Sequence, residues 1–263
     1  MSMMTPAQAA LECVEAMDYL YMDPPACPQG GVLVKSRVLD DVALIWPRKD
    51  HTVLAFAGTR NVAQWFSNFD YHLRRTVDGA RVHEGTYNAV TYMVRDIHNA
   101  LFRYSTPLHV CGHSRGALLA GEWIRRDGSS HDVTQFTTLG GPRIGDAQFG
   151  QIVTMACAED CQFFRITNNN DPVPVTPPSV KGYRHFGELW HIDRKGKAHK
   201  SGLGMMASLW DGIAGRAGAA WKRVAFDGIA DHRVRSGYGP AVRAWHASES
   251  AAPVDGGKTE GGA

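Results

Sequence analysis

Apolar residues recur along this chain at two spacings, one typical of helices and the other typical of strands. Residues 5–21 repeat apolar positions at helical spacing, and Thr5 and Gln8 frame a proline in the pattern of an N-terminal capping box. Residues 41–47 and 52–59 are β-branched or aliphatic runs joined by a turn-like stretch. These two runs predict an antiparallel pair of strands.

From residue 85 onward, helical and strand-like segments follow one another in turn. Helices are predicted for 85–104, for 117–124 and from about residue 146, and strands are predicted for 108–111, 133–139, 161–167 and 183–193, the last as a strand or a hairpin. Strands that alternate with helices are typical of a mostly parallel sheet covered on both faces. The expected fold class is therefore α/β.

The most specific local pattern is Gly112-His113-Ser114-Arg115-Gly116, which lies between a strand-like run and a helix-forming run. A serine in such a turn adopts a strained backbone conformation, and small glycines flank it because a Cβ would clash with the neighbouring strand and helix. The N-terminus of the following helix favours negative charge beside the hydroxyl. The pattern predicts a nucleophilic serine at position 114.

A nucleophilic serine needs a base and an acid, which an α/β-hydrolase supplies later in the chain in the order acid, then histidine. Asp171 follows the predicted strand 161–167, and His232 lies on a late loop. Asp171 as an ordinary turn residue and Asp231 as the acid are the alternatives. No metal site is expected, because His185, His191, Asp193 and His199 match no compact ligand spacing.

Several segments in a fixed order carry a wider resemblance. They are Phe56-Ala57-Gly58-Thr59-Arg60, Val82-His83-Glu84-Gly85-Thr86-Tyr87, the serine turn, Thr138-Leu139-Gly140-Gly141-Pro142-Arg143-Ile144-Gly145-Asp146, Asn170-Asp171-Pro172-Val173-Pro174 and Asp231-His232. Together they resemble the class 3 lipases, the family of fungal triacylglycerol lipases and feruloyl esterases. The resemblance extends from about Val53 to Tyr238.

The resemblance implies an α/β-hydrolase fold with a mostly parallel central sheet and helices on both faces. It implies Ser114 as nucleophile, His232 as general base and then acid, and Asp171 as the carboxylate that orients it. The backbone N–H groups of Thr59 and Arg115 would form the oxyanion hole. The segment after Thr59 corresponds to the family's lid, and its candidates for the lid or acyl pocket are Trp65, Phe66, Asn68 and Phe69.

Two positions depart from the family pattern. Arg115 stands where leucine is usual, and because an unpaired guanidinium is costly to bury, we expect it to reach solvent or to meet a carboxylate. Asn68 stands where the family usually has an aspartate that steadies the oxyanion hydroxyl; asparagine accepts a hydrogen bond there without charge. Both changes bear on the substrate more than on the reaction.

Composition fits a single α/β-hydrolase domain over residues 1–247, followed by a Gly- and Ala-rich tail, 248–263, that is expected to be disordered. Residues 201–226 carry an apolar stripe that is expected to pack on the core, with a surface-active helix as the alternative. A formal net charge of +2 gives no case for a nucleic-acid partner. No run of about 20 apolar residues predicts a transmembrane segment.

The compartment is inferred from the N-terminus and the cysteines. The first residues lack the basic start and apolar core of a signal peptide, and five cysteines is an odd number. Reduced thiols and a cytoplasmic location are the simpler interpretation, while a Cys13–Cys27 bridge and a secreted mature form stay open.

The expected function is hydrolysis of carboxylic esters through an acyl-enzyme, with acylglycerols or related fatty-acyl esters as substrates and no cofactor. Phospholipase A1 and feruloyl or aryl esterase are alternatives within the enzyme class. A catalytically silent scaffold that binds a lipid or a partner protein is the alternative outside it. Transient contact with a lipid interface is the one further partner expected.

Overall fold

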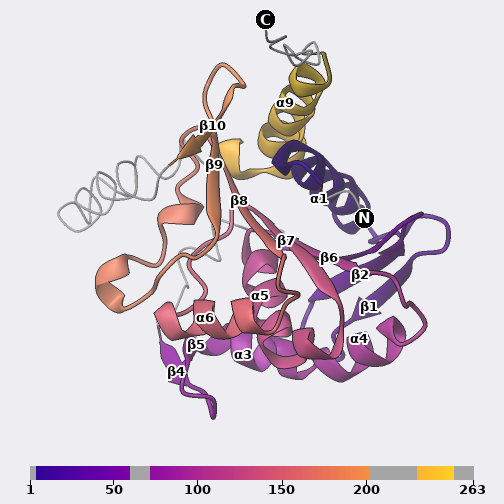
Figure 1. The fold of residues 1–263 in the computed structure, drawn as a ribbon, viewed down its shortest axis with the longest axis vertical. Helices are drawn as coiled ribbons and strands as arrows, with labels where there is room; N and C mark the ends of the chain where they lie inside the picture. Colours follow the sequence, from indigo (N-terminus) through magenta and orange to yellow (C-terminus); the bar gives the residue numbers. More distant parts are fainter. Residues whose placement is uncertain (1–3, 60–71, 202–229, 252–263) are drawn as a thin grey trace, which may run out of the picture.

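A central sheet runs through the computed structural model, which describes residues 4–59, 72–201 and 230–251 (Figure 1). Its strand order is β1-β2-β3-β6-β7-β8-β9-β10, and β3, β6, β7, β8 and β9 are parallel to one another. The outer pairs are antiparallel. The strands are β1 Val32–Lys35, β2 Val42–Pro47, β3 Thr52–Phe56, β6 Leu108–His113, β7 Val133–Leu139, β8 Gln162–Asn168, β9 Glu188–Ile192 and β10 Ala198–Ser201.

Helices cover both faces of this sheet (Figure 1). On one face lie α1 (Pro6–Leu20) and α9 (Gly239–Ala251); on the other lie α3 (Glu84–Thr91), α4 (Val94–Leu101), α5 (Arg115–Asp127) and α6 (Ala147–Met155). A separate hairpin, β4 (Leu73–Arg75) and β5 (Arg81–His83), leads into α3. The predicted α/β class with a mostly parallel sheet is confirmed.

Each face of the sheet has its own apolar core, and β3 contributes to both. Val53 and Ala55 pack with α1 and α9, whereas Leu54 and Phe56 pack with the helices of the opposite face. Because successive side chains of a strand point to opposite faces, a strand covered on both sides reads as a continuous apolar run. All five residues of β3 are buried accordingly.

Helix α1 begins as its sequence predicts, with Thr5 and Gln8 forming the capping box. A charged group also ties this helix to the sheet. The Glu12 carboxylate accepts hydrogen bonds from His51 Nε2 at 2.9 Å and from His109 Nδ1 at 2.7 Å, and His109 Nε2 bonds the Thr137 hydroxyl at 3.0 Å. Burial would raise the pKa of Glu12, but the bonds from the two histidines lower it far below its usual range.

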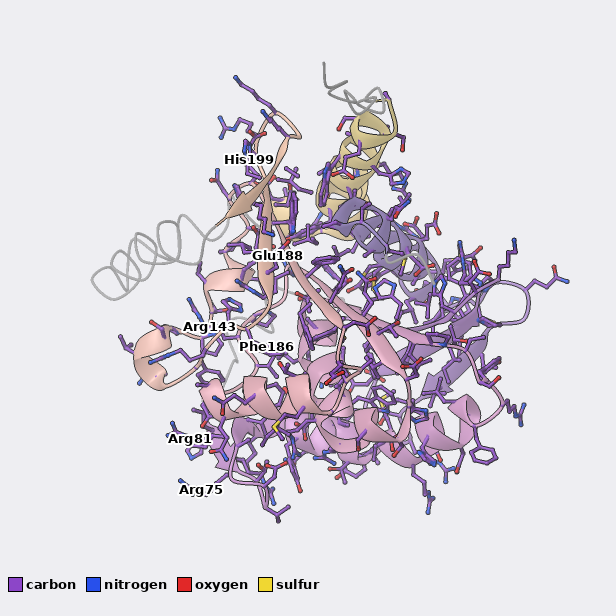
Figure 2. All side chains as sticks on the ribbon, viewed as in Figure 1. Arg75, Arg81, Arg143, Phe186, Glu188 and His199 are labelled. Carbon is purple, nitrogen blue, oxygen red and sulfur yellow. The ribbon has the colours of Figure 1, made fainter. Side chains whose placement is uncertain are left out.

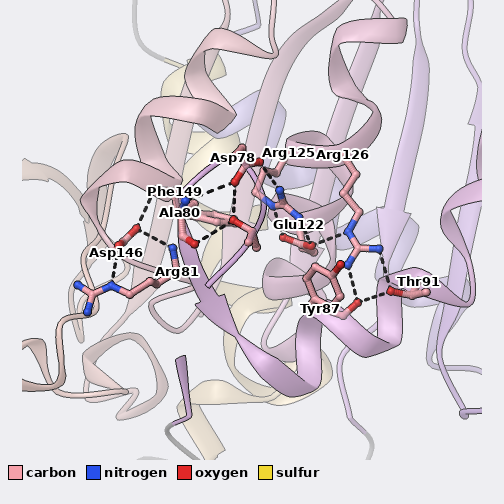
Figure 3. A network of polar contacts seen from close by, with 11 residues as sticks. Asp78, Ala80, Arg81, Tyr87, Thr91, Glu122, Arg125, Arg126, Asp146 and Phe149 are labelled. Atoms are coloured by element: carbon pink, nitrogen blue, oxygen red, sulfur yellow. Dashed lines mark hydrogen bonds and ion pairs between the residues drawn. The ribbon is translucent and has the colours of Figure 1, made fainter. Parts of the chain in front are cut away.

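Helix α5 is held in place by a second polar network (Figure 3). Glu122 is fully buried, and its carboxylate accepts hydrogen bonds from the guanidinium groups of Arg125 and Arg126 at 2.6–2.8 Å. Arg126 also donates to the Tyr87 carbonyl and the Thr91 hydroxyl of α3 at 2.8 Å. These bonds fix α5 against α3, and thereby fix the start of α5 where Ser114 lies.

Several element boundaries test the sequence predictions. The predicted antiparallel pair is confirmed, with Ala43 opposite Phe56 and Pro47 opposite Thr52. The single helix expected over 85–104 is wrong: a break at Tyr92 and Met93 divides it into α3 and α4, which apolar spacing alone does not reveal. The late strand β9 starts only at Glu188 and forms a hairpin with β10.

Two predicted segments lie partly or wholly outside the described residues. Helix α9 continues to Ala251, so the first four residues of the predicted tail are helical, while 252–263 are not described. Nearly all of the segment 201–226 is likewise outside the described part of the chain. Among the residues that are described, no helix has both the length and the apolar character needed to cross a membrane.

Candidate active site

The turn between β6 and α5 has the strained geometry that the sequence predicts. Ser114 adopts φ +56° and ψ −129°, a backbone conformation that residues other than glycine rarely adopt. Its N–H donates to the Leu139 carbonyl at 2.9 Å. A Cβ at Gly112 would lie 2.4 Å from the carbonyl oxygen of Gly116, and one at Gly116 would lie 2.0 Å from that of Phe56. Both glycines are therefore required by close backbone approach.

Asp171 and His232 form a buried pair next to this turn. His232 Nδ1 lies 2.8 Å from Asp171 Oδ2, and the two side chains are 0% and 1% exposed. An ionised carboxylate only accepts hydrogen bonds, so Nδ1 of a neutral His232 ring carries the proton and Nε2 carries the lone pair. Residues 61 positions apart in sequence thus meet in the arrangement that orients a general base.

Two atoms at the centre of the site have no hydrogen-bond partner within the described part of the chain: Ser114 Oγ and His232 Nε2. Both are buried, and buried polar atoms normally find a partner. They lie in the same small region. His113, next to Ser114, bonds the His232 carbonyl through Nε2 at 2.7 Å, and a Cβ at Gly140 would touch both Asp171 and His232. Within the described residues, neither atom is used in a bond inside the fold.

Asp171 is held by two further contacts. Its Oδ1 accepts the Val173 N–H at 2.9 Å, and its Oδ2 accepts the Tyr238 hydroxyl at 2.7 Å. Burial and the neighbouring Asp171 raise the pKa of Tyr238, which keeps the hydroxyl protonated as a donor. The rival acid, Asp231, points elsewhere: its carboxylate accepts from the Asn169 amide at 3.0 Å.

The loop after β3 lies against the serine turn. A Cβ at Gly58 would be 2.9 Å from Ser114 Cβ, so the loop that carries Thr59 packs against the serine turn. The Tyr21 hydroxyl accepts the Gly58 N–H at 3.0 Å and bonds His113 Nδ1 at 2.7 Å. The pKa of His113 lies well below its ordinary value, mainly because the ring is buried and secondly because His232 is close. A neutral His113 thus connects the two halves of the site.

Arg115 meets a carboxylate, as the cost of burying an unpaired guanidinium predicts. Its guanidinium forms a two-point ion pair with Asp41, with Nη2 3.1 Å from Oδ2 and a second, shorter contact from Nη1 to Oδ1. The pair borders a cavity of about 720 Å³ that also contacts Tyr21 and Thr59. The side chain after the serine thus turns toward this cavity and leaves its backbone N–H at the start of α5.

Tyr21, Tyr238 and Asp41 are residues of the site that the sequence did not identify. None stands in a recognised motif: Tyr21 ends the first predicted helix, and the other two occupy ordinary loop or helix positions. The candidates for the lid or acyl pocket, Trp65, Phe66, Asn68 and Phe69, lie outside the described residues.

In the described part of the chain, the histidines weighed as metal ligands do not form a group of three with ligand spacing, although His191 and His199 face each other across β9 and β10. His185 Nε2 bonds the Pro174 carbonyl at 2.6 Å, His191 Nδ1 bonds the Thr167 hydroxyl at 3.0 Å, and His199 Nε2 bonds Asp193 at 2.9 Å. The pKa of His185 lies well below its ordinary value, mainly because the ring is buried and secondly because positively charged arginines are close. Each of these rings has a structural partner of its own.

Comparison with known proteins identifies one family. The model of the family "Lipase (class 3)" matches residues 53–181. A secreted mono- and diacylglycerol lipase of Fusarium solani is 33% identical over 152 residues, which cover 54% of this chain and 44% of that protein. A lipase of Rhizomucor miehei is 29% identical over 151 residues, covering 53% and 41%. The chain spans less than half the length of these two relatives.

Solved lipase structures have the same fold. Lipase II from Rhizopus niveus superposes with a TM-score of 0.58 at 22% identity, covering 72% of this chain and 82% of that one. A lipase from Rhizopus microsporus var. chinensis also gives 0.58, at 25% identity, covering 72% and 76%. The predicted α/β-hydrolase fold is confirmed by these matches.

The expected cytoplasmic location is wrong. Matched relatives from Fusarium solani, Malassezia globosa and Penicillium cyclopium are named as secreted lipases, which overturns it. The expectation depended on the first residues and on an odd number of cysteines, and neither feature reports the compartment. Cys13 and Cys111 are buried, and a thiol enclosed in a core is shielded from oxidants on either side of a membrane.

Proposed function

The chain belongs to the class 3 lipase family, and from that premise we propose that it hydrolyses acylglycerol esters through an acyl-enzyme formed on Ser114. One observation carries the proposal. Ser114 Oγ and His232 Nε2 are buried and have no partner among the described residues, in a site where Asp171 bonds the other nitrogen of His232. A nucleophile and a base that lack partners at a strained turn are suited to act on a bound ester.

The proposed reaction has two stages. Ser114 Oγ attacks the ester carbonyl carbon while His232 Nε2 takes its proton, and the imidazolium then gives that proton to the departing alcohol. Water enters, loses a proton to His232 and attacks the acyl-enzyme. As the fatty acid leaves, the imidazolium gives that proton to Ser114 Oγ, which restores both residues. Asp171 stays ionised throughout and stabilises the imidazolium.

The negative charge on the tetrahedral oxygen needs donors that are in place before the reaction. We assign this role to the backbone N–H groups of Thr59 and Arg115, because the loop of Gly58 packs on Ser114 and Arg115 begins helix α5. Loss of one such donor typically costs about 3 kcal/mol of barrier, which is roughly a hundredfold in rate.

The cavity beside the oxyanion loop supports a substrate with a polar end. Charged groups of Lys35, Asp41 and Arg115 border it together with apolar Leu20 and Leu39. Such a mixed wall suits the glycerol part of a mono- or diacylglycerol, whose free hydroxyls form hydrogen bonds, better than a third acyl chain. Contact with a lipid interface belongs to the same proposal.

A two-part experiment tests the proposal. First, the purified chain is treated with a fluorescent alkyl phosphonate: wild type is expected to be labelled and Ser114→Ala is not. A silent scaffold leaves wild type unlabelled, which refutes the proposal. Second, release of fatty acid is measured on mono-, di- and triacylglycerol emulsions and on a dissolved short-chain ester. Higher rates on the first two emulsions support both the substrate class and the interface.

The assignment of the acid has a matched control. Asp171→Ala removes the partner of His232 Nδ1, whereas Asp231→Ala removes a carboxylate that contacts Asn169. The first variant is expected to lose at least about a thousandfold in kcat and the second less than about tenfold. If Asp171→Ala keeps its activity, Asp171 is not the acid.

A further inference from the structure

A second cluster of histidine and carboxylate lies at the far end of α5 from Ser114. His98 belongs to α4, Asp127 is the last residue of α5, and His131 follows the short turn after it. His98 Nδ1 is 3.0 Å from Asp127 Oδ1, and His131 Nε2 is 3.2 Å from Asp127 Oδ2. Helix α5 has 13 residues, so the cluster lies about 20 Å from the serine turn.

The three side chains already have the spacing of a metal site. One potential ligand atom from each lies within 4.8 Å of the other two. Among the described residues, this is the single group of three or more histidine, cysteine, aspartate or glutamate side chains that meets this spacing. An ion bound between them would need only small side-chain movements.

The position of Asp127 favours a cation. It is buried, and it lies at the C-terminal end of a helix, where the helix dipole disfavours a negative charge. Its two carboxylate oxygens face His98 Nδ1 and His131 Nε2. A positive ion at this point interacts favourably with the carboxylate and with the end of the helix.

The two histidines complement each other as ligands. His131 is largely enclosed, and its ring lies against the Trp123 ring with centroids 5.5 Å apart, which holds its orientation. The His98 side chain is 41% exposed, so an ion can enter from solvent on its side. One ligand is thus fixed by packing and one is accessible.

We propose that His98, Asp127 and His131 bind a divalent transition-metal ion, with zinc as the best chemical match. Two imidazole nitrogens, one carboxylate oxygen and an open fourth position for water suit zinc, whereas calcium and magnesium prefer sets of oxygen ligands. The ion takes the place of the ring protons that point at Asp127, and each neutral ring then carries its single proton on its other nitrogen. It would join α4 to the end of α5 and take no part in ester hydrolysis.

Zinc binding to the full-length chain tests this proposal. The protein is treated with EDTA, dialysed and titrated with zinc chloride in a calorimeter near pH 7. We expect one ion per chain at a high-affinity site, and an increase in Tm of about 5–10 °C when free zinc is 100 times Kd. Magnesium and calcium chloride are expected to give no comparable increase.

Two matched histidine variants locate the ion. His98→Ala removes an exposed ligand with little risk to folding, and it is expected to weaken zinc binding at least about a hundredfold. His199→Ala removes a similarly exposed histidine that also contacts a carboxylate, Asp193, but at the separate β9–β10 hairpin (Figure 2). It is expected to bind zinc as wild type does, and both variants are expected to keep full esterase activity.

A spectroscopic measurement gives an independent result. Cobalt(II) in a four-coordinate site absorbs visible light much more strongly than hydrated cobalt, and we expect this absorption in wild type and His199→Ala but not in His98→Ala. The proposal is overturned if wild type binds no zinc at a high-affinity site, or if His98→Ala binds it as tightly as wild type. The cluster would then be a set of hydrogen bonds and nothing more.

Discussion

His232 and His109 are two buried histidines that each bond a carboxylate through one ring nitrogen but differ at the other nitrogen. Each is nearly inaccessible, and each has Nδ1 within 2.8 Å of a carboxylate, Asp171 for His232 and Glu12 for His109. His109 uses its Nε2 to bond the Thr137 hydroxyl, whereas Nε2 of His232 has no partner among the described residues. Within the described part of the chain, His109 thus completes its bonds inside the fold, whereas His232 leaves one nitrogen unbonded.

This difference separates a structural role from a chemical one. A buried network in which every polar atom is bonded holds elements together, as Glu12 and His109 hold α1 to the sheet. A buried nitrogen without a partner costs free energy in the resting protein, and that cost is recovered when a substrate or an adjacent hydroxyl binds to it. The carboxylate–histidine pair alone therefore does not identify a catalytic histidine.

The largest expected effect comes from removing each histidine in turn. His232→Ala is expected to lower kcat about 10⁶-fold with little change in the free energy of unfolding. His109→Ala should instead lower the free energy of unfolding by about 3 kcal/mol, because Glu12 loses a buried partner, and leave kcat within about tenfold. Ester hydrolysis and urea unfolding measure both variants. Equal losses of activity would remove the distinction between the two histidines.

The next effect is on stability and depends on pH. Glu12→Gln is expected to lower the free energy of unfolding by about 3 kcal/mol at pH 7. The pKa of Glu12 is lower in the folded protein than its ordinary value of 4.5, so its contribution is fully present above that pH and declines as pH falls below it. Urea unfolding at pH 7, 5, 4 and 3 should show wild type and variant converging. A constant difference down to pH 3 would contradict this account.

The smallest effects come from the hydroxyl groups behind each pair. Tyr238→Phe removes the donor to Asp171, so kcat is expected to fall about tenfold with an unchanged KM. Thr137→Val removes the second partner of His109, and it should lower the free energy of unfolding by about 1 kcal/mol with no effect on kcat. The two variants would contradict the comparison if their effects were exchanged.

The sequence predicted those parts of the fold that depend on neighbouring residues. The capping box at Thr5, the serine turn and the Ala43–Phe56 strand pair all follow from residue types at short spacing. The break between α3 and α4 was missed, because apolar positions keep nearly the same spacing across a single irregular turn. Helical periodicity reports which face is buried and not whether the backbone is continuous.

The sequence alone determined the α/β class, the strained serine turn and the order of the candidate acid and base, since each is written in local pattern. The tertiary structure decided that His109, and not His232, has both ring nitrogens bonded within the described residues. It also placed Tyr238 on Asp171, Asp41 on Arg115 and His98 beside Asp127. These pairs lie 67, 74 and 29 positions apart in sequence. Their meeting depends on how helices pack on the two faces of the sheet, which no local spacing encodes.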